Sequence, residues 1–293
     1  MKYLNEKKWR EDAASGIWIA DDITTDTAFS DETQDELLSL EDNSWWFIYR
    51  ADVITGLMDR YFVKDKITVD IGGGNGYTSS VARKKGYYTG LIEPNPIACR
   101  HAKERGIDEV SCGAVTEDSV IDGSIGQATL LDVLEHIEDD RAFVKLLHRK
   151  LSGGGTLLVT VPAFMCLWSS EDDAAGHFRR YRIADLCDLL EASGFDICYR
   201  SYFMGFLFLP ILLVRVLLEK FGILKPQGQR TEEERAEIAK SQFKSRGGFV
   251  NMVLSVFEGI EKRLMKKERR VPFGSSIIVV ARKGDICMSI LGK

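Results

Sequence analysis

The sequence predicts an α/β fold with a doubly wound, mostly parallel sheet, and three observations support this prediction. Apolar, strand-like runs alternate with helical patterns between residues 66 and 193. A glycine-rich turn, Gly72–Gly76, joins the first of these strands to the first of these helices. Acidic residues follow the ends of two further strands, at Glu93 and Asp132. Regular alternation of this kind indicates parallel strands joined by right-handed crossovers, here in a sheet of seven strands.

Composition and charge place the chain among ordinary globular proteins. It has 293 residues, of which 45% are hydrophobic and 28% are charged, so a full core can form. A net charge of −5 gives no general affinity for nucleic acid. The six cysteines include no Cys-x-x-Cys pair, so we expect neither a disulfide framework nor a bound metal. The amino terminus lacks the apolar stretch of a signal peptide, which favours a cytoplasmic protein.

Residues 1–64 are expected to form an N-terminal arm and a helical cap. Residues 1–30 are polar and mixed, and they predict loops with a fragment of strand. Ser30–Thr33 can cap a helix, and residues 53–62 carry apolar side chains at helical spacing. The aromatic residues at 45–49 either pack in the core or form a lid in which Trp46 lines a substrate pocket.

The glycine turn and its flanks indicate a nucleotide-type ligand rather than a bare turn. Glycine has no Cβ, so a ligand can approach the backbone, and the following helix adds free N–H groups. A dinucleotide fingerprint would have a glycine at Tyr77, and a carboxylate at Asp70 would repel a pyrophosphate. The turn therefore favours a positively charged ligand without phosphate, such as S-adenosylmethionine (AdoMet), over a nicotinamide dinucleotide.

Residues at the ends of further strands add to this Rossmann-like site. The second strand, 87–93, ends at Glu93, where a carboxylate can accept hydrogen bonds from two adjacent ribose hydroxyls. A short strand at 109–112 leads into residues 113–118, which we expect to pass close to an adenine ring. The fourth strand, beginning at residue 128, brings Asp132 to the same edge, and the fifth strand is 156–161.

Four segments, taken in this order, resemble class I AdoMet-dependent methyltransferases of the type 11 or type 12 group: Val69–Gly76, Glu93, Leu131–Ile137 and Gly153–Val159. The resemblance covers about residues 65 to 200 and implies AdoMet as cofactor, S-adenosylhomocysteine as product and no metal. In such proteins the glycine loop holds the methionine moiety and the acid of the second strand binds ribose. The cofactor residues expected here are Asp70, Gly72, Gly73, Gly74, Asn75, Gly76, Glu93, Pro94, Ala114, Val115, Asp132 and Val133.

A long loop after the fifth strand, residues 162–181, is expected to bind the methyl acceptor, because open α/β sheets bind substrates at this edge. His177 is the favoured base and His136 the second candidate. The alternative for His177 is a hydrogen bond to one of the acids at 171–173 that organises the loop. The substrate-binding candidates are Trp46, Trp168, Arg179, Arg180 and Tyr181. The two arginines either bind an anionic acceptor or anchor the loop through salt bridges.

The Rossmann-like core is expected to end at residue 203, and residues 204–271 form a helical insertion before the last strand. The apolar run at 202–218 is interrupted by Pro210 and Arg215, and a second amphipathic helix follows with a basic end. The insertion is interpreted as a lid, a homodimer surface or a peripheral contact with the inner membrane face, with a membrane span as a further alternative. Residues 272–293 supply the last strand and the tail.

Together these features predict an AdoMet-dependent methyltransferase that uses a histidine base to methylate an oxygen. The acceptor would be a small molecule or one linked to lipid or glycan, since the motif Gly176–Tyr181 resembles a subgroup associated with glycan and lipid assembly. The alternatives are methylation at nitrogen or carbon, and a non-catalytic AdoMet-binding partner subunit. Tyr77 and Asp70 disfavour a nicotinamide-dependent oxidoreductase.

Overall fold

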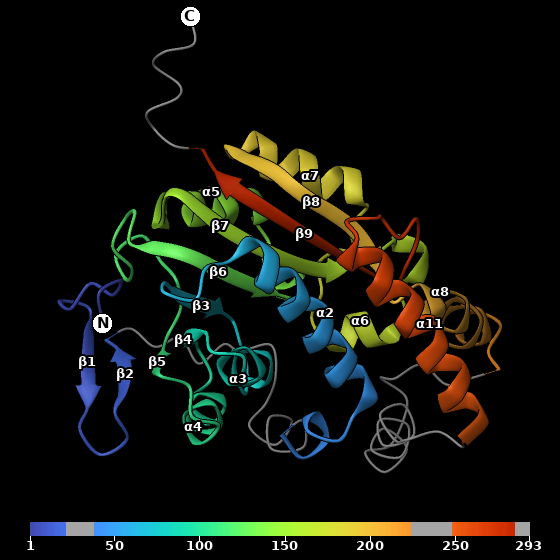
Figure 1. Ribbon diagram of the computed structural model, residues 1–293, viewed down its shortest axis with the longest axis horizontal. Helices are drawn as coiled ribbons and strands as arrows, with labels where there is room; N and C mark the ends of the chain where they lie inside the picture. Colours follow the sequence, from blue (N-terminus) through green and yellow to red (C-terminus); the bar gives the residue numbers. More distant parts are fainter. Residues whose placement is uncertain (22–37, 224–247, 285–293) are drawn as a thin grey trace, which may run out of the picture.

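One nine-stranded sheet runs through the computed structural model, which describes residues 1–21, 38–223 and 248–284 (Figure 1). In space the strands follow the order β1-β2-β5-β4-β3-β6-β7-β9-β8. Strands β5, β4, β3, β6 and β7 are parallel, and β9 runs antiparallel between β7 and β8. This arrangement confirms the predicted fold class. The strands are β1 (Trp9–Asp12), β2 (Ile17–Ala20), β3 (Ile67–Ile71), β4 (Tyr88–Glu93), β5 (Glu109–Cys112), β6 (Ile125–Leu131), β7 (Leu151–Pro162), β8 (Phe195–Phe203) and β9 (Ser276–Lys283).

The amino-terminal segment extends the predicted seven strands to nine. β1 and β2 form an antiparallel hairpin, and β2 runs parallel to β5 with Trp18 opposite Ser111. The indole N–H of Trp9 donates a hydrogen bond to the carbonyl of Ser119 at 2.7 Å, which ties the hairpin to the loop after β5. These strands have four residues each, too few for a clear alternation of apolar and polar side chains.

Helices cover both faces of the sheet. Successive residues of β9 show this directly, because Ile277 and Val279 belong to one buried cluster and Ile278 and Val280 to another. The first cluster includes residues of α5 and α7, and the second includes residues of α2, α3 and α11. The helices are α2 (Trp45–Tyr61), α3 (Tyr77–Lys84), α4 (Pro96–Glu104), α5 (Asp140–Lys150), α6 (Ser170–Ala174), α7 (Ile183–Ala192), α8 (Gly205–Pro210), α9 (Leu218–Lys220) and α11 (Gly248–Lys266).

The predicted helical cap is α2, and α11 of the insertion lies beside it (Figure 1). Ser44 begins α2 by accepting a hydrogen bond from the backbone N–H of Trp46 through its hydroxyl. The buried carboxylate of Glu261 on α11 accepts hydrogen bonds from the Tyr49 hydroxyl and from the backbone N–H of Gly205, the latter at 2.9 Å. One acidic side chain therefore joins α2, α11 and the start of α8.

A π-helix, η3 (Ile211–Leu217), continues the chain from α8 to α9. Within the described ranges no helix combines the length and the apolar character needed to cross a membrane. The predicted helix cap at Ser30–Thr33, residues 224–247 of the insertion and the tail at 285–293 lie outside the described residues.

Candidate active site

The glycine loop between β3 and α3 leaves no room for side chains at two of its positions. Gly72 has φ +70°, and a Cβ added there would lie 2.6 Å from Cγ2 of Val133. A Cβ on Gly73 would lie 2.7 Å from Oδ2 of Asp70. The loop is therefore packed against the end of β3 on one side and the residues after β6 on the other, and only glycine fits at these two positions.

Asp70 lies beneath the loop with 1% of its surface exposed. The hydroxyl of Ser79 donates a hydrogen bond to its Oδ2 at 2.7 Å, and the hydroxyl of Thr129 donates one to Oδ1 at 2.7 Å. Burial raises the pKa of this carboxyl group, and the two hydroxyl donors oppose the rise. Both carboxylate oxygens of Asp70 thus anchor the loop to α3 and β6, and its expected contact with the cofactor stays a prediction.

Glu93 ends β4 directly beside the glycine loop, as predicted. Its Oε2 accepts a hydrogen bond from the backbone N–H of Gly74 at 3.0 Å, and Oε1 accepts one from Asn95 at 2.9 Å. Burial raises the pKa of the Glu93 carboxyl group, whereas the two backbone donors lower it. The next residue, Pro94, is half-buried and leads into α4. Glycine loop and carboxylate thus meet at the carboxyl edge of the sheet.

The remaining predicted cofactor residues of this half of the sheet follow β3 and β5 in the chain. Asn75 is buried, and its amide donates to Oε1 of Glu41 at 3.3 Å. Its Oδ1 lies 3.0 Å from Nδ1 of His101 on α4. Gly76 is left-handed at φ +73° and begins α3. After β5, Ala114 is exposed and Val115 is buried.

Asp132 follows β6 with a left-handed backbone, φ +55°, which is uncommon for a residue other than glycine. Its carboxylate forms an ion pair with Arg50, a buried residue of α2. The Thr160 hydroxyl donates to Oδ1 of Asp132 at 3.0 Å and accepts from the Arg50 guanidinium at 2.7 Å. One third of the Asp132 side chain, 32%, stays exposed, so this carboxylate still faces the edge where a ligand would lie.

Glu135, His136 and His177 come together beside Asp132. Glu135 and His136 belong to a short 3-10 helix, η1 (Leu134–His136), and His177 lies in the loop after α6. The ring centroids of His136 and His177 are 4.7 Å apart with the rings nearly perpendicular. Burial and the neighbouring His177 lower the pKa of His136 to about 4, so His136 is neutral at physiological pH. Burial raises the pKa of Glu135 well above its usual value.

The acceptor loop is held together by Asp172, whose side chain is fully buried. Its Oδ1 lies 2.8 Å from Nδ1 of His177 and accepts a hydrogen bond from Nε of Arg180 at 2.7 Å. Arg179 forms an ion pair with Asp140 at 2.7 Å, measured from Nη1 to Oδ2. The two arginines predicted to bind substrate therefore form ion pairs that anchor the loop, which was the stated alternative.

The aromatic substrate candidates differ in their exposure. Tyr181 is 5% exposed, and its hydroxyl donates a hydrogen bond to Asp140 at 2.8 Å; its expected contact with the acceptor stays a prediction. Trp168 is half-buried, with its indole N–H donating to Asp173 at 3.0 Å. Trp46 is half-buried, and the Cζ atom of the Arg50 guanidinium lies 5.2 Å from the centroid of its ring. A contact of these two tryptophans with the acceptor stays a prediction.

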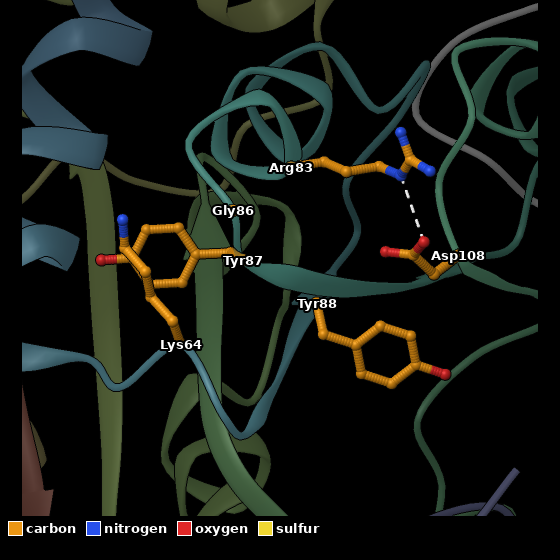
Figure 2. Close-up of a pocket in the computed structure, with 6 residues that line it drawn as sticks. All are labelled: Lys64, Arg83, Gly86, Tyr87, Tyr88 and Asp108. Carbon is orange, nitrogen blue, oxygen red and sulfur yellow. Dashed lines mark hydrogen bonds and ion pairs between the residues drawn. The ribbon is translucent and has the colours of Figure 1, made fainter.

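A shallow pocket at the opposite edge of the sheet, where the parallel strands begin, does not belong to this site. Figure 2 shows it at the amino-terminal end of β4, where Tyr88 begins the strand, with Arg83 reaching toward Asp108. The Nε of Arg83 lies 3.1 Å from Oδ1 of Asp108. Since ligands of open α/β sheets bind at the carboxyl ends of the strands, this pocket carries no candidate role.

The fold is that of a Rossmann-like α/β domain, with the candidate site at the carboxyl edge of its parallel strands. A protein-family model described as a methyltransferase domain matches residues 47–199, more than half of the chain. The chain therefore belongs to this family of class I AdoMet-dependent methyltransferase domains, which confirms the predicted resemblance.

Similar proteins agree with this assignment. A probable S-adenosylmethionine-dependent methyltransferase of Mycolicibacterium smegmatis is 28% identical over 163 residues, which cover 54% of this chain and 62% of that protein. The phosphoethanolamine N-methyltransferase 2 of Haemonchus contortus, solved with AdoMet, has a TM-score of 0.55 at 15% identity, covering 89% of this chain and 59% of that one. A chain from the Haloferax volcanii complex of the Trm112 activator with a methyltransferase has a TM-score of 0.54 at 13% identity. The match covers 87% of this chain and 95% of that one. The structural likenesses support the fold alone.

Two groups of site residues were missed from the sequence. Arg50 lies in a helical pattern far from Asp132 in the chain, and only the position of α2 over the strand ends brings the two together. The cluster of Glu135 with the two histidines was missed because His177 lies within a long loop whose path the sequence does not specify. The Glu135-His136 pair itself, directly after a predicted strand, was the available signal.

Proposed function

We propose that this chain transfers the methyl group of AdoMet to an oxygen atom of a small or lipid- or glycan-linked acceptor. The contact between Glu93 and the glycine loop carries the proposal. A carboxylate with its Oε2 3.0 Å from the backbone nitrogen of Gly74 lies where ribose hydroxyls would meet a cofactor held by the loop. S-adenosylhomocysteine would be the second product. The candidate cofactor residues given above remain the proposed contacts.

The transfer itself requires positioning more than covalent assistance. The acceptor oxygen attacks the methyl carbon in line with the bond to sulfur, that bond breaks, and its electron pair stays on the sulfur of S-adenosylhomocysteine. The acceptor must lie about 3 Å from the methyl carbon, and water must be excluded. A hydroxyl acceptor also loses one proton to a base.

His177 is the proposed base. Asp172 contacts Nδ1 of its ring at 2.8 Å, which leaves Nε2 as the nitrogen that can accept a proton and stabilises the imidazolium that forms. Asp172 is fully buried and also bound to Arg180, so the orientation of the ring is fixed by two elements of the loop. His136, next to His177, is the second candidate.

The described parts of the insertion are proposed to act as a lid over the acceptor. The ring of Phe208 on α8 packs against the ring of Phe164, two residues after the end of β7, with centroids 5.6 Å apart. Phe206 on the same helix lies 5.9 Å from Trp45 of α2. The helix therefore bridges the strand ends and the cap. Leu209 on α8 and Leu213 on the following helix η3 are exposed, so sedimentation velocity and co-sedimentation with anionic liposomes test the dimer and membrane alternatives.

A transfer assay with an isotope label tests the proposed function. The purified chain is incubated with AdoMet that carries a trideuterated methyl group and with a metabolite and lipid extract of its source organism. We expect a labelled product, together with S-adenosylhomocysteine, and the labelled atom identifies oxygen, nitrogen or carbon methylation. Folded protein that binds AdoMet but labels nothing would favour the non-catalytic partner subunit.

The same assay, once an acceptor is found, tests the base. We expect His177→Ala to leave AdoMet affinity unchanged and to lower turnover by about 10²-fold. His148→Ala is the matched control, because that histidine lies at the far end of α5 against the carbonyl of Gly194. Wild-type turnover in the His177 variant would remove this residue from the role.

A further inference from the structure

We propose that Glu135, His136 and His177 bind one divalent transition-metal ion at the carboxyl edge of the sheet. Each residue offers one ligand atom, and these three atoms all lie within 4.8 Å of one another. Metal–nitrogen and metal–oxygen bonds of about 2.1 Å bring ligand atoms closer than this, so small side-chain rotations complete the site. No metal was expected from the sequence, and the proposed site departs from that expectation.

The buried side chain of Glu135 is placed to bind a cation. Its side chain is 1% exposed, and Oε2 is buried without a hydrogen-bond partner in the described part of the chain. An unpaired carboxylate is costly to bury. The two nearby cations are engaged elsewhere, since Arg50 pairs with Asp132 and Arg180 pairs with Asp172. A metal ion would supply the missing positive charge.

The two histidines are held as metal-binding histidines usually are. Nδ1 of His177 contacts the Asp172 carboxylate at 2.8 Å, the arrangement in which a carboxylate fixes the ring so that the other nitrogen can bind metal. His136 is hydrogen-bonded to the backbone of Ala175, a contact that orients its ring. The rings lie 4.7 Å apart between centroids, close enough to share one ion.

The donor set selects the class of ion. Two imidazoles and one carboxylate favour Zn²⁺, Co²⁺, Fe²⁺ or Mn²⁺ over Mg²⁺ and Ca²⁺, which prefer oxygen ligands. Three protein ligands also leave an open coordination position, as in catalytic zinc sites. Val133 directly precedes η1 and packs against Gly72 of the glycine loop. The proposed metal site therefore adjoins the proposed cofactor site.

The use of the ion rests on the proposed function, although binding of the ion does not. A hydroxyl bound at the open position loses its proton more readily, because the ion stabilises the resulting oxyanion. The oxyanion would then attack the methyl carbon as described above, and the proton would go to bulk solvent. In the metal-loaded protein His177 is a ligand rather than a base, so the ion takes over the activation of the acceptor.

Direct metal titration tests the site without any acceptor. The untagged full chain is stripped with a chelator and titrated with Zn²⁺ against a chromophoric competitor, and with Co²⁺ monitored by its visible absorption. We expect one ion per chain. Glu135→Gln and His177→Gln should each weaken binding by about tenfold or more, and Co²⁺ should give the intense bands of a four- or five-coordinate nitrogen and oxygen site.

The controls separate this site from adventitious binding. His148→Gln and the double variant Cys166→Ser, Cys198→Ser should retain the affinity, because they remove a distant imidazole and two exposed thiols. Urea unfolding of each variant verifies that it is folded. Wild-type protein that is folded and binds no Zn²⁺ would overturn the proposal, as would binding that survives both ligand variants. AdoMet affinity, measured on the same samples, reports separately on the proposed function.

Discussion

The guanidinium of Arg50 forms an ion pair with the carboxylate of Asp132 and donates a hydrogen bond to the Thr160 hydroxyl at 2.7 Å. Through this contact the helical cap reaches the carboxyl ends of β6 and β7. The left-handed backbone of Asp132, which costs on the order of 1 kcal/mol or more, is thereby held in place. Cap and sheet edge therefore form one unit around the candidate site.

Removal of this arginine should destabilise the protein more than removal of an exposed arginine on the same helix. We expect Arg50→Ala to lower the free energy of unfolding by about 3 kcal/mol, because it leaves Asp132 without its buried partner. Arg60→Ala, which breaks a pair with Glu268 exposed on both sides, should cost less than about 1 kcal/mol. Urea unfolding measures both, and equal losses would contradict the structural role of the Arg50 pair.

Glu93 is expected to determine cofactor affinity. Glu93→Gln replaces a carboxylate oxygen by an amide donor, so it should weaken AdoMet binding by about tenfold or more. Glu104→Gln, at the exposed end of α4, is the matched control and should bind AdoMet as the wild type does. Calorimetry of the three proteins provides the comparison. Unchanged affinity in the Glu93 variant would place the ribose elsewhere.

Two glycine-to-alanine variants should change stability in opposite directions. At Gly73 the new Cβ would lie 2.7 Å from Asp70 and 2.8 Å from Leu91, so the loop must shift and the protein should be destabilised. At Gly56, an exposed position inside α2, the space within 4 Å is empty, and alanine should stabilise the helix by up to about 1 kcal/mol. Thermal unfolding tests this, and a Gly73→Ala protein as stable as wild type would show that the loop is looser than described.

The buried Glu41 should make stability depend on pH. Burial raises the pKa of this carboxyl group to about 7. The guanidinium of Arg105 opposes the rise, with its Nη2 2.8 Å from Oε2 of Glu41. Between these two pKa values the folded protein retains a proton on Glu41 that the unfolded chain has released, since the usual pKa of the group is 4.5. The contribution of Glu41 to the free energy of unfolding is therefore largest below pH 4.5 and is lost as the pH rises toward 7. Glu41→Gln should remove it. The variant should therefore gain stability relative to wild type between about pH 5 and about pH 7.5, and a difference that is constant with pH would contradict the assignment.

Much of the fold followed from local pattern, because each core strand is a buried apolar run ended by a recognisable residue. Gly72–Gly76, Glu93 and Asp132 were placed at one edge by the rule that parallel strands end together. The amino-terminal hairpin was missed because its pairing with β5 is a long-range contact between short strands.

The side chains of the site were harder to predict, since their partners depend on loops. Asp70 is turned beneath the glycine loop by Ser79 and Thr129, one residue on each neighbouring element. Arg180 was foreseen either as an anion ligand or as a loop anchor, and the position of Asp172 decided for the anchor. Periodicity and spacing contain no information about such partners, because the acceptor loop folds on itself through side chains rather than through regular structure.

Cofactor binding at the glycine loop is measured by calorimetric titration of the wild-type full chain with AdoMet. We expect one site per chain, with a dissociation constant on the order of 10 μM, competition by S-adenosylhomocysteine, and no heat with NAD. Folded protein that shows no binding at about 1 mM AdoMet would contradict this expectation.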